Sequence, residues 1–222
     1  MPRHRLRFAK TGKAVYLSHL DLMRTMQRAF LRAGAAIRHT EGFNPHAYIS
    51  VALPLSVGVE SRCELLDFEL LDGPSLDRLP AELTTQLPEG IEILSAYETE
   101  AKAKDIVWLS IAGTLEYDTQ PDTGSTAQAL TAFFAQGSIF VKKRTKKKEE
   151  TELDIVPLLR EIRFIPDGGH KIKLEAVVAA QNPPLSPGLL LDAISQKAPE
   201  LAPDFAAFCR QEVYDRGMRV FV

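Results

Sequence analysis

The chain contains only two cysteines, and it contains no long apolar run. Cys63 and Cys209 lie far apart and match no metal-binding spacing, and without a C-x-x-x-C-x-x-C motif the chain cannot by itself hold a four-iron cluster. No apolar run approaches the roughly 20 residues that span a bilayer, and the N-terminus lacks the apolar core of a signal peptide. We therefore expect a cytoplasmic protein with buried thiols and no metal or cofactor of its own.

The composition of the chain is otherwise that of a globular protein. Of its 222 residues, 45% are hydrophobic and 25% are charged, which suits one large domain or two small ones. The net charge of −2 conceals an uneven distribution: residues 1–40 carry nine Lys and Arg against one acid, whereas residues 41–100 carry two Arg against twelve acids. Such a split indicates a basic surface for an anionic partner, or two blocks that pair with each other in the fold.

A strand and a capped basic helix are predicted near the start of the chain. Residues 3–8 alternate as a half-buried strand does, with apolar residues on one face and arginines on the other. Ser18 is the expected N-cap of the helix, Asp21 completes a capping-box-like pattern, and Gly34 is the expected stop. The residues expected to form the buried stripe are Met23, Met26, Phe30 and Ala33. The arginines expected on the opposite face are Arg24, Arg28 and Arg32.

The remaining segments predict an α+β fold built from two similar halves. In the first half we expect a short strand (35–39), a loop (41–46), strands at 47–53 and 63–71, a helix at 75–87 and a strand at 90–99. In the second half we expect strands at 106–117, 138–143, 170–180 and 208–216, helices at 126–136 and 185–197, and an ambiguous segment at 154–165. The order β-α-β-β-α-β in each half predicts two tandem ferredoxin-like domains with antiparallel sheets, residues 1–100 and residues 106–222.

One stretch, residues 16–61, concentrates polar groups at the joints between these elements. Its motifs YLSHLDL (16–22), GFNPH (42–46) and GVES (58–61) resemble those of the radical-SAM-linked protein family, a bacterial domain of unknown function numbered 2344. The resemblance covers essentially the whole chain. It implies a protein that accompanies a radical SAM enzyme, near genes for RNA processing and ribosomal proteins, and it implies no particular reaction. The iron-sulfur cluster and S-adenosylmethionine would then belong to the partner enzyme.

Three groups of basic residues predict contact with RNA phosphates: Arg3, Arg5 and Arg7; Arg24, Arg28 and Arg32; and Lys142–Lys148. Each group has a structural alternative. Arg5 and Arg7 can pair with Asp67 and Glu69, the helix arginines can simply be solvated, and the lysine tract can form a charged hairpin with the acids that follow it. No aromatic platform like that of an RNA-recognition motif is evident.

His19 and His46 are the candidate catalytic residues. An imidazole beside a carboxylate such as Asp21 or Glu41 can act as a general base, and RAMP-type paired ferredoxin-like domains that cut RNA use a histidine near a glycine-rich loop. That resemblance is one of fold alone. In the alternative, His19 makes a hydrogen bond at the helix start and His46 packs under the loop. Metal ligation by His19, Asp21 and His46 fits no established ligand pattern.

These observations favour an accessory protein, not catalytic by itself, that binds a radical SAM enzyme and presents an RNA or a ribosomal component to it. No membrane or DNA partner is expected. In this hypothesis the arginines contact phosphate, Asn44 and His46 orient the substrate, and Ser18 and Asp21 hold the helix start. The full set of predicted binding residues is Ser18, His19, Asp21, Arg24, Arg28, Asn44, His46, Glu60 and Ser61. The alternative function is a metal-independent RNA endonuclease with His19 or His46 as the general base.

Overall fold

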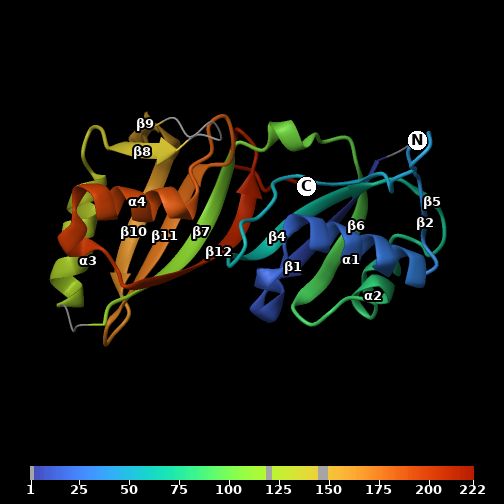
Figure 1. Ribbon diagram of the computed structural model, residues 1–222, viewed down its shortest axis with the longest axis horizontal. Coiled ribbons are helices and arrows are strands. Elements are labelled where there is room, and N and C mark those ends of the chain that lie inside the picture. The colour runs from blue at the N-terminus through green and yellow to red at the C-terminus, as the bar shows by residue number, and fades with distance from the viewer. Residues whose placement is uncertain (1–2, 119–121, 145–149) are drawn as a thin grey trace. The chain divides into compact units, whose positions relative to one another are not determined.

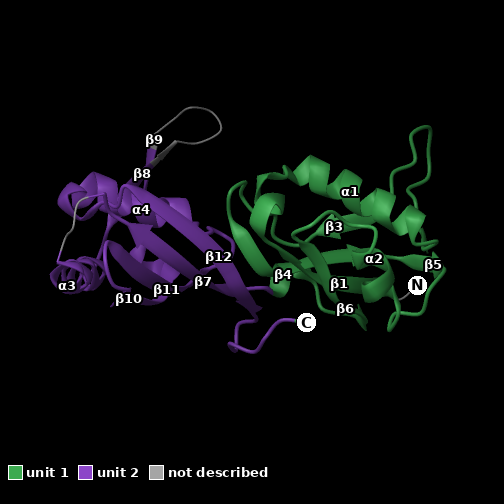
Figure 2. Ribbon diagram, turned by 90° about the horizontal axis from the view of Figure 1, so that it is seen from below, with its two compact units in different colours: residues 1–105, 222 green, residues 106–221 purple. Residues whose placement is uncertain are grey.

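A computed structural model describes residues 3–118, 122–144 and 150–222 of the chain. The described residues form four α-helices and mostly antiparallel sheet. They divide into two compact units (Figure 2): unit 1 contains residues 1–105 together with Val222, and unit 2 contains residues 106–221. No helix in the described part of the chain is long and apolar enough to cross a membrane.

Unit 1 contains an antiparallel sheet in which the strands follow the order β3-β4-β1-β6 (Figure 1). These strands are β1 (Arg3–Lys10), β3 (Ile49–Val51), β4 (Glu60–Phe68) and β6 (Ile91–Thr99). Two α-helices, α1 (His19–Arg32) and α2 (Leu79–Thr84), pack on one face of the sheet. Two short strands, β2 (Ala36–Ile37) and β5 (Leu70–Asp72), pair with each other separately, and Gly12–Tyr16 and Ala103–Asp105 form 3-10 helices. Along the chain, the four sheet strands and two helices follow the order β-α-β-β-α-β.

Helix α1 buries a stripe that differs slightly from the predicted one. Met26 and Phe30 lie in the core as predicted, whereas Met23 and Ala33 are only half-buried. The complete buried stripe is Leu22, Met26, Ala29 and Phe30, which are spaced by four, three and one positions. The buried face is therefore turned slightly toward Leu22 and Ala29, and it packs in one core with Leu6, Phe8 and Phe68 of the sheet. The predicted end is confirmed, since α1 stops at Arg32 and Gly34 has a φ of +67°.

Helix α2 is shorter than the predicted segment 75–87. It begins at Leu79 and places Pro80 in its first turn, where the missing N–H of proline costs no intrahelical hydrogen bond. Leu79 and Leu83 are fully buried against the sheet. The predicted strand 63–71 also ends early, at Phe68, because the following residues leave the sheet and form β5.

Unit 2 repeats the β-α-β-β-α-β order with one insertion. Its antiparallel sheet follows the order β10-β11-β7-β12. The sheet strands are β7 (Trp108–Glu116), β10 (Leu159–Pro166), β11 (Lys171–Ala179) and β12 (Phe205–Tyr214). The helices are α3 (Thr123–Phe134) and α4 (Pro187–Lys197), and Val156–Leu158 and Pro199–Leu201 form 3-10 helices. The insertion is a separate hairpin of β8 (Phe140–Arg144) and β9 (Glu150–Asp154). The ambiguous segment 154–165 therefore becomes a 3-10 turn followed by β10.

The core of unit 2 is apolar and partly aromatic. In Figure 1, α4 lies in front of β10 and β11. Phe134 of α3 stacks on Phe164 of β10 with ring centroids 5.6 Å apart. Ser186 caps α4 by accepting a hydrogen bond from the Leu189 N–H, which sets the start of the helix at Pro187.

Residues 145–148 of the predicted lysine tract lie outside the described residues.

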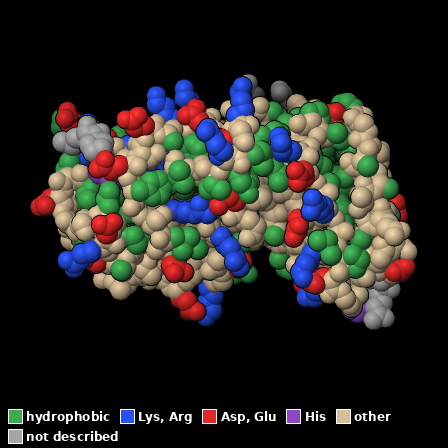
Figure 3. All heavy atoms as spheres, turned by 180° about the vertical axis from the view of Figure 1, so that it is seen from behind, with side chains coloured by type: hydrophobic (Ala, Val, Ile, Leu, Met, Phe, Trp, Pro, Cys, Tyr) green, Lys and Arg blue, Asp and Glu red, His purple; other side chains and the backbone are tan. Residues whose placement is uncertain are grey.

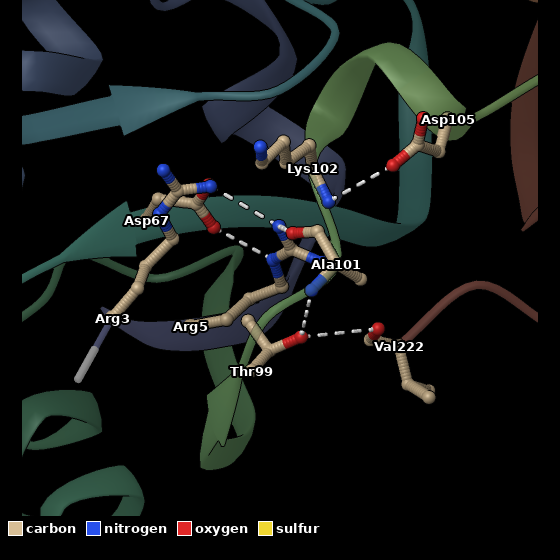
Figure 4. A network of polar contacts seen from close by, with 8 residues as sticks. All are labelled: Arg3, Arg5, Asp67, Thr99, Ala101, Lys102, Asp105 and Val222. Carbon is tan, nitrogen blue, oxygen red and sulfur yellow. Dashed lines mark hydrogen bonds and ion pairs between the residues drawn. The ribbon is translucent and has the colours of Figure 1, made fainter.

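Arg5, on the face of β1 that carries the arginines, forms a buried ion pair with Asp67 (Figure 4). Arg5 is fully buried, and its Nε atom donates to Asp67 Oδ1 at 2.6 Å. Its Nη2 atom donates to Asp67 Oδ2 at 3.2 Å and to the Ala101 carbonyl at 2.9 Å. Arg5 therefore cannot contact RNA phosphates, and the predicted alternative pairing with Asp67 is confirmed. Glu69 forms an ion pair with Arg38, at 3.0 Å.

Both cysteines are free thiols. Cys63 is buried, as predicted, whereas Cys209 is only half-buried.

Candidate ligand-binding groove

A groove of about 530 Å³ lies in unit 1 between the C-terminal half of α1, strand β2 and the loop that carries the GFNPH motif. Its polar side chains are Gln27, Arg28, His39 and His46. Its apolar lining consists of Phe30, Leu31, Ala35, Ile37, Pro45 and Ala47, with Ala36 at the edge of β2. No acidic side chain is among these lining residues, all of which belong to the described segment 3–118.

The loop is closed at its base by backbone pairing. His39 and Ala47 form an antiparallel bridge, and the Thr40 N–H donates to the His46 carbonyl at 2.8 Å. The His46 N–H in turn donates to Thr40 Oγ1 at 2.9 Å. Gly42 has a φ of +128°, a conformation that residues with a Cβ rarely adopt, and it reverses the chain between these two ends. The closed base brings His39 and His46, seven positions apart in sequence, to the same groove.

The His39 ring has a defined orientation. Its Nδ1 atom lies 3.0 Å from the Ile37 carbonyl oxygen. Because a carbonyl oxygen can only accept, Nδ1 carries the proton of this hydrogen bond. The Nε2 atom of a neutral His39 ring is then a hydrogen-bond acceptor, and it becomes a donor when the ring is protonated.

Arg28 is the cation of α1 that is available to a ligand. Arg24 lies 3.3 Å from Asp21, and Arg32 donates to the side chain and the backbone carbonyl of Gln86. The side chain of Arg28 is exposed and makes no hydrogen bond or ion pair with another residue in the described part of the chain. An exposed, unpaired guanidinium in a groove without acids favours an anionic ligand.

The first turn of α1 forms a separate polar cluster outside the groove lining. Ser18 Oγ accepts a hydrogen bond from the Asp21 N–H at 3.2 Å and donates to Asp21 Oδ2 at 2.7 Å, which confirms the predicted capping pair. His19 is exposed in the same turn. These groups stabilise the start of α1, since they satisfy N–H groups that lack intrahelical partners.

Glu60 and Ser61 are also placed away from the groove lining. Glu60 Oε1 accepts a hydrogen bond from the Gly12 N–H at 3.0 Å, at the turn that follows β1. Ser61 is fully buried, and its Oγ atom accepts from the Cys63 N–H at 3.2 Å. A buried hydroxyl cannot contact a ligand at the surface, so Ser61 supports the start of β4. Asn44 is exposed on the loop.

Buried Lys10 holds the segment that leads into α1. Its Nζ atom donates to the Val15 carbonyl at 3.2 Å and to the Leu17 carbonyl at 3.1 Å. Burial lowers the pKa of Lys10, and the nearby Glu64 carboxylate partly offsets this effect by raising it. The alternation of β1 places Lys10 on the same face as the buried Leu6 and Phe8, whereas its charge favours exposure, so only the structure establishes that it is buried.

The structure therefore brings Arg28 and His46 together in one groove and adds His39, which the sequence analysis missed. The sequence signal for His39 is its position at one end of the segment HTEGFNPH, whose other end is His46. A turn at Gly42 that pairs the two ends would predict their proximity. Within the described residues, no group of three or more His, Cys, Asp or Glu is arranged to hold a metal ion.

Comparison with known proteins identifies a family and one shared fold. A family model described as "Uncharacterized protein conserved in bacteria (DUF2344)" matches residues 3–187. No curated protein matches the chain. A chain in the "Crystal Structure of a Cbf5-Nop10-Gar1 Complex" is similar over 95% of this chain, with 9% identity and a TM-score of 0.51. At that identity the likeness concerns the fold alone, and this chain spans only 48% of that chain.

A second solved structure carries no argument about the fold. It is described as the "Crystal Structure of an Unknown Protein from Galdieria sulphuraria". It covers 96% of this chain and 98% of its own, with 13% identity and a TM-score of 0.27.

Proposed function

The chain belongs to the DUF2344 family of uncharacterized proteins conserved in bacteria, and we propose that it is an RNA-binding accessory protein of a radical SAM enzyme. In this proposal the groove of unit 1 binds the RNA, and the partner enzyme supplies the iron-sulfur cluster, the S-adenosylmethionine and the chemistry. The protein acts in the cytoplasm. Its two units are tandem ferredoxin-like domains, which their common β-α-β-β-α-β order and antiparallel sheets support.

The observation that carries the proposal is the set of polar groups in the groove. Arg28, His39 and His46 line a space of about 530 Å³ that contains no acid among its described lining residues. A guanidinium and protonatable imidazoles suit a phosphate, and the apolar lining suits a base. Each nucleotide of RNA contains both a phosphate and a base, whereas an unmodified ribosomal protein contains neither.

The partner is proposed from the sequence motifs SHLDL and GFNPH, through their resemblance to radical-SAM-linked proteins. Co-expression of this chain with a radical SAM protein from the same bacterium, followed by affinity purification with and without RNA, tests the partnership. We expect the enzyme to be retained. An enzyme that is not retained under either condition would contradict the accessory role.

RNA binding is tested with the pair Arg28→Gln and Arg24→Gln. Both residues are exposed arginines of α1, but only Arg28 lines the groove and lacks a partner in the described residues. Since a hydrogen bond to a charged group contributes about 1.5–3 kcal/mol, Arg28→Gln should weaken RNA binding by roughly tenfold or more. Arg24→Gln should change it by less than about threefold. Equal effects would place the RNA elsewhere, and capture of a ribosomal protein without RNA would replace RNA as the ligand.

A second candidate, a metal-independent RNA endonuclease, is favoured by one observation: two histidines and an arginine line the same groove. One imidazole would take the proton of a ribose 2′-hydroxyl as the 2′-oxygen attacks phosphorus. The other, protonated, would give its proton to the leaving 5′-oxygen as the P–O bond breaks, and Arg28 would stabilise the phosphorane charge.

Incubation of total RNA with the pure protein in EDTA separates the two candidates. Cleavage that His46→Ala and His39→Ala abolish, and that His19→Ala does not, would establish the nuclease. RNA that remains intact while bound supports the accessory protein. His19 is the matched control because it is an exposed histidine outside the groove lining.

A further inference from the structure

We infer that the groove accepts a single unpaired nucleotide of a single-stranded RNA, and that Phe43, at the tip of the GFNPH loop, stacks on the neighbouring base. This inference rests on the proposed RNA-binding function and names the form of RNA that the groove recognises. Four features of unit 1 support it: the size of the groove, the placement of its polar groups, the exposure of Phe43, and the engagement of Arg5, Arg24, Arg32 and Arg38 within the protein.

The size of the groove selects an unpaired nucleotide. A volume of about 530 Å³ is that of a small-molecule site, whereas an RNA duplex is recognised across a broad surface. In an A-form duplex the bases are stacked and paired, so a base can enter a concave site only when it is single-stranded or splayed out. The groove therefore favours loops, bulges and single strands.

The groups that line the groove match the two parts of a nucleotide. Arg28 supplies a guanidinium for the phosphate, while Gln27 and the Nε2 atom of His39 supply donors and acceptors for a base edge. Phe30 is 1% exposed and belongs to the core, so it forms part of a fixed floor. Leu31 is 79% exposed and forms an apolar rim on α1. Together they form an apolar surface for the faces of a base.

Phe43 is the most exposed large hydrophobic residue that the structure describes. Its relative exposure is 106%, and it lies two positions before Pro45, which lines the groove. A fully exposed phenyl ring on a loop with a closed base offers a flat apolar surface next to the ligand site. Stacking of a base on such a ring contributes about 1–3 kcal/mol and requires an unstacked base. Tyr48 does not offer the same surface, because the Arg38 guanidinium lies 5.4 Å from its ring centroid.

The remaining arginines of this region are largely engaged within the protein. Arg5 is buried against Asp67, Arg24 pairs with Asp21, and Arg38 pairs with Glu69. Arg32 is held by Gln86. Figure 3 shows the face behind that of Figure 1, on which Lys and Arg side chains are interspersed with Asp and Glu, so that face offers no continuous basic surface for a duplex either. Duplex binding through many phosphate contacts is therefore not favoured, whereas one or two contacts at the groove suffice for a stacked single strand.

Fluorescence anisotropy tests this inference. The probes are a labelled single-stranded RNA of about ten nucleotides and the blunt duplex of the same sequence, titrated over a series of salt concentrations. We expect the single strand to bind at least roughly tenfold more tightly, with a salt slope between about −0.7 and −1.4, as one or two phosphate contacts give. Phe43→Ala should weaken single-strand binding by about 5- to 150-fold. Leu20→Ala is the control, since Leu20 is 64% exposed on α1 outside the groove lining, and it should change nothing.

The results separate failure of this inference from failure of the proposed function. Equal or tighter binding of the duplex, a salt slope steeper than about −3, or Phe43→Ala without effect would overturn the single-nucleotide inference while RNA binding stood. If neither RNA binds, the proposed RNA-binding function itself is wrong. If RNA binds and Arg28→Gln has no effect, the RNA lies outside the groove and the single-nucleotide inference fails.

Discussion

Arg5 on β1 lies directly opposite Asp67 on β4, and the two side chains are joined by hydrogen bonds of 2.6 and 3.2 Å. The Arg5 side chain is 0% exposed and that of Asp67 is 16% exposed, so neither charge is well hydrated. The same guanidinium also holds the Ala101 carbonyl, which belongs to the segment that follows β6 (Figure 4). The pair therefore joins two inner strands of the unit 1 sheet to the segment at the end of that unit.

Asp67→Ala should destabilise the protein strongly, because it leaves the Arg5 charge buried without its carboxylate partner. Removal of one member of a buried ion pair costs about 3–5 kcal/mol, and urea unfolding followed by circular dichroism measures this loss. The control is Arg3→Ala: Arg3 is 42% exposed and 3.7 Å from Asp67, so its loss should cost less than about 1 kcal/mol. Similar losses for both variants would mean that the Arg5–Asp67 pair is well solvated.

Ser18→Ala tests whether the SHLDL motif has a structural or a binding role. Loss of the hydrogen bond from the Asp21 N–H to Ser18 Oγ should lower the free energy of unfolding by about 1 kcal/mol. RNA affinity should not change, because Ser18 does not line the groove. Ser18→Thr should restore most of the stability, since threonine is also a preferred N-cap and keeps the hydroxyl that donates to Asp21 Oδ2. A variant with unchanged stability and weakened RNA binding would instead make Ser18 a ligand-binding residue.

The free energy of unfolding should decrease at high pH because of Tyr117. Burial, and to a lesser degree the Asp204 carboxylate, raises the pKa of Tyr117 to about 12, and its hydroxyl donates to the Leu201 carbonyl at 3.1 Å. In the unfolded chain the phenol ionises near pH 10. The neutral phenol therefore contributes its full stabilisation below about pH 10. As the pH rises from about 10 to about 12, the free energy of unfolding falls by about 1.4 kcal/mol per pH unit.

Absorbance at the phenolate band measures this directly. Tyr117 should titrate about two pH units later than ordinary tyrosine in the folded protein, and Tyr117→Phe should remove that step. Burial also raises the pKa of Tyr97, so the step of Tyr97 should remain in the variant. The variant should also lose the decline of unfolding free energy in this window. If Tyr117→Phe removes a step near pH 10 and leaves the late part of the titration unchanged while the protein stays folded, the hydroxyl of Tyr117 is accessible to water.

The sequence predicted those features that depend on local signals. Ser18 and Asp21 mark the start of α1 because a cap is a contact between residues three positions apart. The alternation of residues 3–8 likewise indicated β1, and the predicted helix 185–197 matches α4 except that α4 starts two positions later, at Pro187. Such signals require no knowledge of what packs against the element.

Features that depend on tertiary contacts were not predictable in the same way. Glu60 and Ser61 follow a glycine turn, and Ser61 is buried although it lies on the face of β4 opposite to the core residues Leu66 and Phe68, so alternation alone does not reveal its burial. His39 was missed because its proximity to His46 arises from the closure of a loop and from the packing of β2 beside α1. The availability of Arg28 was not predictable from the helix pattern either. That pattern places Arg24, Arg28 and Arg32 alike on the solvent face, whereas in the structure Arg24 pairs with Asp21 and Arg32 donates to Gln86.

Thr40 should control the shape of the groove without contacting the ligand. Its Oγ1 atom accepts a hydrogen bond from the His46 N–H at 2.9 Å, and its own N–H donates to the His46 carbonyl. Thr40→Val keeps the size of the side chain but removes the acceptor, so His46 loses one of its two restraints. Because a hydrogen bond of this kind contributes about 0.5–1.5 kcal/mol, RNA binding should weaken by about two- to tenfold, while global stability changes little at this exposed site.

Thr40→Ser distinguishes this positioning role from a general effect of the substitution. Serine retains the acceptor oxygen, so it should restore both RNA affinity and the slow hydrogen exchange of the His46 amide, which Thr40→Val should accelerate. Rescue of exchange without rescue of affinity would show that loop order does not limit binding. Loss of affinity in Thr40→Val with unchanged exchange would mean that the threonine side chain touches the RNA itself, and the site would then extend from the groove along the outer edge of the loop.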